Sequence, residues 1–237
     1  MDRAPPGPND SRLTTYRLVG MYAGKGTGMA KAKPEKISAR TKILDAAFAA
    51  IREKGYAATT VDDLCAAAGV TKGAFFHHFK SKDGLAVAAA DHWAETTSAL
   101  FAAAPYHAAA DPLDRVLGYI DFRKSILKGG VPEFTCLVGT MVQEAYAKHP
   151  AIRDACARSI CAHAATLEAD IAEAIEKHHI DADWTPASLA LHTQAVLQGA
   201  FILAKAKGGA QVAADSADHL RRYVELLFHR RERERRK

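Results

Sequence analysis

Apolar residues recur at helical spacing along most of this chain. Leu44, Ala47, Phe48 and Ile51 fall at positions i, i+3, i+4 and i+7, and Gly55 then ends the pattern. Two short helices are expected within residues 60–79. Further helices, each bounded by a capping residue, a proline or a glycine, are expected over about 81–103, 111–128, 132–148, 152–175, 185–207 and 216–227. The pattern predicts an all-α protein of nine helices with no convincing strand.

A helix-turn-helix unit is expected between residues 60 and 82. Thr60 is a suitable N-cap, and Asp63 completes a shortened capping box three residues later. Gly69 supplies the left-handed residue that ends this first helix, and Thr71 caps the second. In such a unit the second helix lies in the major groove of DNA and presents its N-terminal residues to base edges.

The helix that ends near Gly55 should pack across this unit. Together the three helices, which we call the reader, are the smallest arrangement that can enclose the large apolar side chains of the region in one core: Phe48, Leu64, Phe75 and Phe79. Because only Lys80 and Ser81 follow before the next helix, that helix is expected to connect the reader with the rest of the chain.

At these residues the chain also resembles a known family. Residues 69–85 read G-V-T-K-G-A-F-F-H-H-F-K-S-K-D-G-L, which is similar to the DNA-binding core of the tetracycline-repressor (TetR) family. The match joins the turn glycine, Gly73, an aromatic pair, H-F and S-K-x-x-L. It extends over about residues 38–92, and beyond it only the helical layout agrees. The family most often has tyrosine where this chain has Phe76, so a phosphate-contacting hydroxyl is missing there.

The resemblance and the local pattern together indicate a set of contacts with double-stranded DNA. Backbone N–H groups and the helix dipole favour a phosphate beside the start of the second helix. A glycine in that helix costs about 1 kcal/mol of helix propensity relative to alanine, which suits close approach of DNA. The expected contacts are Arg40, Thr60, Thr71, Lys72, Gly73, Phe76, His77 and Lys82. Each residue alone is better explained as an ordinary cap or surface charge, but their combination favours DNA.

The basic charge of the chain lies at its ends. The formal net charge is +5, although residues 25–42 hold six basic residues against one acid and residues 221–237 hold eight against three. The body between these segments is therefore acidic. A basic arm just before a DNA-reading unit suits phosphate contact through counterion release. The C-terminal residues fit a solvated basic tail equally well.

No grouping of reactive side chains predicts catalysis or a metal site. Cys65, Cys136, Cys156 and Cys161 show no paired framework. Cys156 and His163 share a helix face, but that face is apolar, where packing is the usual explanation. No cofactor is expected, and neither an apolar run of membrane-spanning length nor a secretion signal is found, which favours a reducing cytoplasm. An enzyme or carrier with incidental basic ends stays open as the alternative.

The resemblance implies a pocket for a small effector, between the helix that follows Ser81 and the helices after it. Aromatic and polar side chains at suitable positions give the candidate lining: Trp93, Phe101, Tyr119, Phe122, Phe134, Met141, Gln143 and His192. Each of these residues is individually more typical of core packing than of ligand contact. The sequence does not identify the effector.

These expectations divide the chain into four parts. They are a disordered leader over 1–33, a DNA-binding domain over 34–82, a helical effector-binding and dimerisation domain over 83–230, and a basic tail over 231–237. A palindromic operator needs two readers at a fixed spacing. The helix over 186–205 and the helix ending at Phe228 are therefore expected to form a four-helix interface in a homodimer. With the resemblance, this predicts a cytoplasmic, ligand-responsive transcriptional regulator, a repressor released from DNA by a small molecule.

Overall fold

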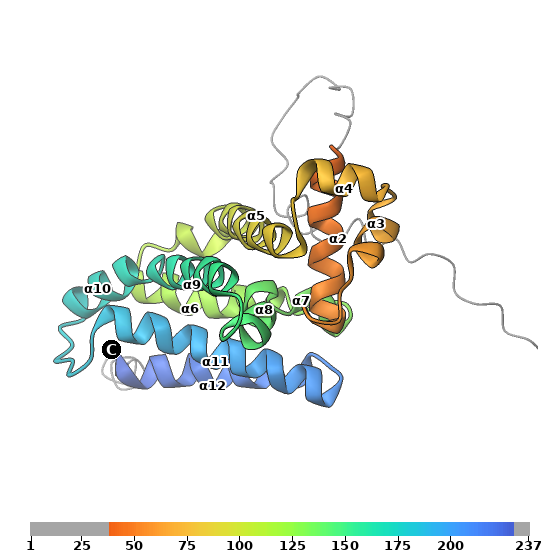
Figure 1. The fold of residues 1–237 in the computed structure, drawn as a ribbon. Helices are drawn as coiled ribbons and strands as arrows, with labels where there is room; N and C mark the ends of the chain where they lie inside the picture. Colours follow the sequence, from red (N-terminus) through yellow and green to blue (C-terminus); the bar gives the residue numbers. More distant parts are fainter. Residues whose placement is uncertain (1–37, 230–237) are drawn as a thin grey trace, which may run out of the picture.

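The computed structural model describes residues 38–229, and the regular elements within this range are all helices (Figure 1). The all-α class expected from the apolar pattern is confirmed. The expected leader over 1–33, the basic residues before Ser38 and the basic tail over 231–237 lie outside the described residues.

The reader lies at one end of the molecule (Figure 1) and consists of α2 (Ala39–Lys54), α3 (Val61–Ala68) and α4 (Lys72–His78). Thr60 and Asp63 form the expected capping box: the Asp63 N–H donates to the Thr60 hydroxyl at 3.1 Å, and the Thr60 N–H donates to the Asp63 carboxylate at 2.9 Å. Gly69 is left-handed, with a φ of 64°, as a turn glycine should be. The expected core side chains are all buried: Phe48, Leu64, Phe75 and Phe79.

A long helix leads out of the reader, and a short turn and a second helix follow it. These elements are α5 (Lys82–Ala102), the 3₁₀-helix η2 (Pro105–Ala108) and α6 (Pro112–Ser125). The Ser81 hydroxyl caps α5 by accepting the Gly84 N–H at 3.0 Å. The Asp111 carboxylate caps α6 by accepting the Leu113 N–H at 2.9 Å. Both helices therefore begin where their capping residues predicted.

The helix expected over 132–148 is divided into α7 (Val131–Phe134) and α8 (Leu137–Ala145). Thr135 interrupts it with an extended backbone, at φ −79° and ψ 158°. The Cys136 sulfur then caps α8 by accepting the Gly139 N–H at 3.4 Å. Because apolar residues continue at helical spacing on both sides of Thr135, the pattern did not reveal this break.

The helix expected over 152–175 is also divided, into α9 (Pro150–Ala165) and α10 (Glu168–Lys177). At the junction the N–H groups of Thr166 and Leu167 donate to carbonyl oxygens three residues back, on His163 and Ala164. These hydrogen bonds span three residues, as in a 3₁₀-helix, so they tighten the last turn of α9, and the helix ends there. The two divisions raise the number of α-helices in the described residues above the nine expected.

The last two helices, α11 (Pro186–Lys207) and α12 (Gln211–Leu227), lie side by side along one edge of the molecule (Figure 1). Thr185 caps the start of α11, and Gly208 ends it with a φ of 76°, as expected. By contrast, α12 begins before the expected Ser216, because Ala213 already packs into the core.

Among the described residues, α11 is long and apolar enough to cross a membrane, with a mean hydropathy of 1.3. The expectation that no apolar run approaches this length is therefore corrected. In this fold the helix packs within the protein, because Leu189, Leu197 and Phe201 are buried against neighbouring helices. Its buried Gln194 is hydrogen-bonded inside the molecule, as a core helix requires.

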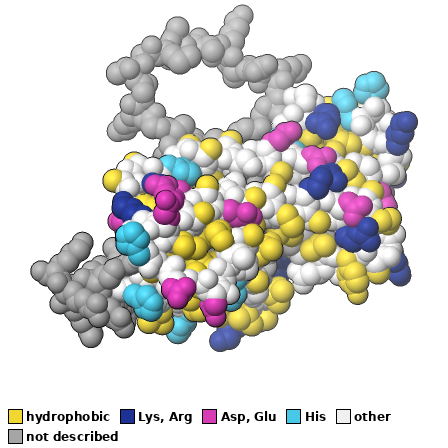
Figure 2. All heavy atoms as spheres, turned by 90° about the vertical axis from the view of Figure 1, so that its left-hand side faces the viewer, with side chains coloured by type: hydrophobic (Ala, Val, Ile, Leu, Met, Phe, Trp, Pro, Cys, Tyr) yellow, Lys and Arg dark blue, Asp and Glu magenta, His cyan; other side chains and the backbone are white. Residues whose placement is uncertain are grey.

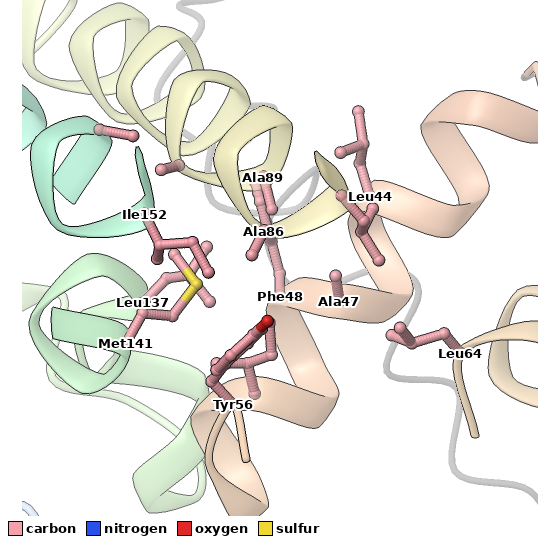
Figure 3. Packing of buried hydrophobic residues seen from close by; sticks show 14 of the residues in the cluster. Leu44, Ala47, Phe48, Tyr56, Leu64, Ala86, Ala89, Leu137, Met141 and Ile152 are labelled. Atoms are coloured by element: carbon pink, nitrogen blue, oxygen red, sulfur yellow. The ribbon is translucent and has the colours of Figure 1, made fainter. Parts of the chain in front are cut away.

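Most of the core belongs to two hydrophobic clusters. The first joins the reader with α5, α8 and α9, and in Figure 3 Phe48 and Tyr56 of the reader lie close to Leu137, Met141 and Ile152. The second surrounds the end of α5 with η2, α6, α10, α11 and α12. The reader therefore shares one core with helices far along the chain.

Candidate nucleic-acid interface and ligand cavity

One side of α4 is packed and the other is exposed. Phe75 is fully buried, whereas Lys72 and His77 are exposed. Phe76 leaves 53% of its surface accessible, and its ring stands edge-on to Phe75 at 5.2 Å between centroids. The face that a helix-turn-helix unit presents to DNA is thus left uncovered by the described chain.

Gly73 has no packing reason within the described chain to be a glycine. A Cβ atom at this position would meet the Thr71 hydroxyl oxygen at 3.7 Å, which is an ordinary van der Waals distance. That hydroxyl caps α4 by accepting the Ala74 N–H at 3.1 Å. The absent side chain leaves space for another molecule to approach the helix backbone closely.

The cations beside α4 differ in how they are held. The Lys72 ammonium lies 2.8 Å from Asp62, with both side chains more than half exposed, and this hydrogen-bonded pairing raises the pKa of Lys72. Exposed pairs of this kind are weak, so a phosphate can replace Asp62. The Arg40 guanidinium lies over the Phe79 ring, 5.6 Å from its centroid, at the C-terminal end of α4.

Lys82 and Thr60 were expected to contact DNA phosphates, but in this structure their side chains make hydrogen bonds that hold the turn before α3 and the start of that helix. The Lys82 ammonium donates to three carbonyl oxygens at 3.1 to 3.4 Å, those of Tyr56, Ala57 and Thr59. The Thr60 hydroxyl donates to the Asp63 carboxylate at 2.8 Å as part of the capping box. Contact of Lys82 or Thr60 with DNA therefore stays a prediction.

A polar junction joins the reader to the turn between α8 and α9. The Tyr56 hydroxyl donates to one oxygen of Asp83 at 2.5 Å, and His149 Nδ1 lies 2.6 Å from the other. These hydrogen bonds, that from Tyr56 first, lower the pKa of Asp83. The Ala57 N–H also donates to Glu144 of α8 at 2.7 Å. The orientation of the reader is thus fixed by hydrogen bonds as well as by the shared core.

A cavity of about 90 Å³ lies among α5, α6, α7, α9 and α11. Trp93, Phe101 and Phe134, three of the expected effector contacts, line it. The wall also contains polar and charged groups that were not among the expected effector contacts, and these include Arg52, Thr97, Arg123, Glu133, His163, Gln194 and Gln198.

The structure places the remaining candidates away from the cavity wall: Tyr119, Phe122, Met141, Gln143 and His192. Tyr119 and Phe122 lie behind Phe101, with ring centroids 5.5 and 5.4 Å from that of Phe101. Met141 is fully buried in the first cluster, Gln143 lines a separate depression, and His192 is exposed on α11. Helical periodicity identifies the buried face of a helix, but not which part of that face borders a void.

A chain of hydrogen bonds runs from the wall of the cavity into the core behind it. Gln194 Nε2 donates to the Tyr119 hydroxyl at 2.8 Å, which lies 2.9 Å from His163 Nε2. Arg123 Nη1 also lies 3.5 Å from His163 Nε2, and because a guanidinium can only donate, this nitrogen is the acceptor. Burial, followed by the charge of Arg123, lowers the pKa of His163 to about 3. The imidazole is therefore neutral at pH 7, with its proton on Nδ1.

The Arg123 guanidinium is enclosed by aromatic rings. It lies 5.4 Å from the ring centroid of Phe101, 6.0 Å from that of Tyr119 and 5.5 Å from that of Phe201. Such faces attract a cation, but they carry no net charge. Arg123 follows Tyr119 by four residues on α6, so the helical spacing that selected Tyr119 contained a signal for this arginine too.

Arg52 brings the reader itself to the cavity wall. This residue of α2 is 8% exposed, and its guanidinium lies over the Trp93 ring, 5.2 Å from the centroid. Its Nε donates to the Phe48 carbonyl at 2.9 Å and its Nη1 to the Glu133 carbonyl of α7 at 3.0 Å. Burial lowers the pKa of Arg52 to about 10, so the group is still charged at pH 7.

The four cysteines of the described chain are free thiols. Cys65 and Cys156 are buried, Cys161 is exposed, and Cys136 lies at the cavity wall. Within residues 38–229, no three side chains of the metal-ligating types converge. The cavity wall therefore offers aromatic rings, amides, hydroxyls, a thiol, an imidazole, a carboxylate and two guanidinium groups.

Family models match both parts of the chain. The model described as "Bacterial regulatory proteins, tetR family" matches residues 43–89. The model described as "Tetracyclin repressor-like, C-terminal domain" matches residues 112–220. The two matches include most of the reader and nearly all the helices from α6 to α12.

Curated relatives resemble part of the chain. The HTH-type transcriptional repressor KstR2 of Rhodococcus jostii (strain RHA1) is 44% identical over 50 residues, which cover 21% of this chain and 24% of that protein. For the first curated relatives that it matches, the chain spans between 19% and 40% of their own length. Their likeness therefore concerns less than half of each relative's length.

Solved structures resemble most of the chain. A TetR transcriptional regulator from Chloroflexus aurantiacus J-10-FL superposes with a TM-score of 0.69 at 27% identity, over 78% of this chain and 93% of that one. The TetR family regulator CifR, a cysteine mutant complexed with a 26 bp operator DNA, shares the fold with a TM-score of 0.66 at 19% identity, over 81% of this chain and 98% of that one. With both family models matched, the chain belongs to the TetR family of bacterial regulatory proteins.

Proposed function

We propose that the protein is a DNA-binding transcriptional regulator, a repressor, that leaves a palindromic operator when a small molecule fills the cavity. The uncovered face of α4 carries this proposal, because Gly73 opens space beside Lys72 that no other part of the described chain uses. The TetR family membership supports the same role. So do the repressor KstR2 and the operator complex of CifR among the similar proteins.

In the proposed complex, α4 lies in the major groove. Its N-terminal residues approach the DNA, with the helix dipole and the first N–H groups beside a phosphate. Phe76 packs on the sugar-phosphate backbone through its exposed ring. The residues proposed to contact either the base edges or the sugar-phosphate backbone of DNA are Arg40, Thr60, Thr71, Lys72, Gly73, Phe76, His77 and Lys82.

A homodimer is proposed to form through α11 and α12. Large exposed apolar side chains are concentrated on these two helices: Leu191, Ile202, Leu203, Tyr223 and Leu226. Apolar side chains also gather in the middle of the molecular face shown in Figure 2. Adjacent exposed apolar groups mark association surfaces, and two helices packed on their symmetry mates give a four-helix interface.

Release from DNA is proposed to follow from contacts that the cavity shares with the reader. The cavity borders α5, which is joined to α4 through Phe79, Lys80 and Ser81 alone, and it borders Arg52 of α2. A ligand that fits the cavity better in one orientation of the reader will shift the protein toward that orientation. By reciprocity, DNA must weaken ligand binding by the same factor by which the ligand weakens DNA binding.

Selection of bound DNA from a random pool by the full chain tests the proposed function. The expected result is enrichment of a palindrome whose half-sites lie about one helical turn apart, or a multiple of it, as two linked readers require. Failure to enrich any sequence would contradict the proposal and favour the alternative, a helical carrier or enzyme. No cofactor and no catalytic activity belong to the proposal, and the proposed location is the cytoplasm.

A further inference from the structure

We propose that the ligand of the cavity is a small, mainly apolar carboxylic acid, with Arg123 as the counter-ion of its carboxylate. This inference rests on the proposed role of the cavity as the effector site. It specifies the chemical class of the effector.

Arg123 is a cation whose charge is not balanced by a neighbouring carboxylate. The ion pairs found among the described residues do not include it, and its polar neighbours are His163 Nε2 at 3.5 Å and the Tyr119 hydroxyl. His163 is neutral, and burial also raises the pKa of Tyr119, so neither ring supplies a negative charge. The guanidinium therefore has a positive charge and several N–H donors without an anionic acceptor.

The other charged groups of the wall do not change this balance. Arg52 contributes a second positive charge and Glu133 a negative one, and the two lie together because Arg52 donates to the Glu133 backbone. The charge of Glu133 also acts on Arg52, where it raises the pKa that burial lowers. With the Arg52 and Glu133 charges offset, the cavity has a net charge of one positive unit, located at Arg123.

The rest of the wall selects the body of the ligand. Trp93, Phe134 and Leu127 supply apolar surface, and Gln198 is one of the neutral polar groups of the wall. The cavity volume of about 90 Å³ is below the roughly 150 Å³ of an engineered protein cavity that holds benzene. The acid is therefore small, with an apolar body smaller than a benzene ring. A carboxylate suits the guanidinium because its two oxygens match two parallel N–H donors.

The test compares acids with neutral molecules of the same shape. Butanoate and butanamide, and pentanoate and pentanamide, are titrated into the full chain by calorimetry at millimolar concentrations. One acid or both should bind, and each binding acid should do so about tenfold more tightly than its amide, a difference of about 1.4 kcal/mol, because hydrogen bonds to charged groups are stronger than those between neutral groups. The two pairs also show which length of alkyl chain the cavity accepts.

Arg123→Gln should abolish the preference for the acid while leaving the amide affinity little changed. Lys128→Gln, which removes an exposed cation just beyond the end of α6, should leave the preference intact. If Arg123→Gln does not fold, by circular dichroism, then Arg123→Lys serves in its place, and the preference should fall without vanishing. Equal binding of acid and amide by the unaltered protein overturns the inference, as does binding of neither acid.

Failure of this inference can be told apart from failure of the proposed function. DNA selection does not need a ligand, so an enriched palindrome with no preference for acids leaves the regulator in place and removes only the ligand class. Acid binding through Arg123 without any enriched DNA would keep the ligand class and remove the regulator.

Discussion

Lys72 faces two anions that compete for it, the Asp62 carboxylate of α3 and, in the proposed complex, a phosphate of DNA. Lys72→Ala should weaken binding to all DNA sequences and reduce the slope of log affinity against log salt by about one, the effect of losing one phosphate contact. Asp62→Asn should act in the opposite direction, because it removes the competing anion 2.8 Å away.

Operator titrations at several salt concentrations measure both effects. Lys128→Ala, far from α4 in the sequence and exposed, is the matched control for loss of one surface charge. An unaltered affinity and slope in Lys72→Ala would exclude Lys72 from the interface.

Phe76 is the position at which this chain departs from the usual TetR tyrosine. Its ring is 53% exposed, so an added hydroxyl has room to reach solvent or phosphate without disturbing the core. Phe76→Tyr should strengthen DNA binding by about 0.5–1.5 kcal/mol, the net contribution of one hydrogen bond. Fluorescence anisotropy with the selected operator measures the change, and weaker binding by the tyrosine variant would refute the phosphate contact.

For single residues, the sequence predicted the role correctly where the role is local, and less well where it depends on neighbours distant in the chain. Thr60, Asp63 and Gly69 act within one turn of chain, so their spacing was sufficient to predict their geometry. Lys82 was expected to face DNA, but its ammonium reaches back to carbonyl groups more than twenty residues earlier. No local pattern contains that contact.

Among the elements, α2 has two roles, since it packs across the reader and carries Arg52 into the cavity wall. Arg52→Gln should destabilise the fold by about 1–3 kcal/mol, because it leaves buried carbonyl groups without their donor. It should also reduce the factor by which a cavity ligand weakens DNA binding, since one contact between the cavity and the reader is lost.

Urea unfolding measures the first effect, and operator titrations with and without the acid ligand measure the second. Glu53→Gln, at the adjacent exposed position of α2, is the control. If folded Arg52→Gln keeps the full effect of the ligand on DNA affinity, α5 alone transmits the change.

The elements themselves were predictable where chemical signals marked their ends. Ser81, Asp111 and Thr185 begin helices as expected from their capping side chains. The breaks at Thr135 and Thr166 were missed because the apolar spacing runs on through them and tertiary packing decides the bend. The break at Thr135 directly follows Phe134, which lines the cavity as expected although the break itself was missed.

For the molecule as a whole, the proposed dimer can be tested without disturbing the core. Leu227, an obvious choice from the sequence, packs partly against its own chain, so an acid there would also disturb folding. Leu226 is 65% exposed, and Leu226→Glu should therefore yield folded monomers that bind the palindrome weakly. An acid in an apolar interface costs several kcal/mol. Light scattering together with circular dichroism decides the matter, and a folded dimer would place the interface elsewhere.

The core that the reader shares with α8 and α9 bears on how such proteins can be recombined. A foreign reader grafted in place of residues 38–80 would bring its own shapes against Leu137, Met141 and Ile152, which fit Phe48 and Tyr56. Mismatched shapes leave voids or clashes, each destabilising by about 1–3 kcal/mol. The chimaera should therefore melt below its parents and recover when the facing residues of α8 and α9 are grafted too. Equal melting temperatures without them would show that the reader is a detachable module.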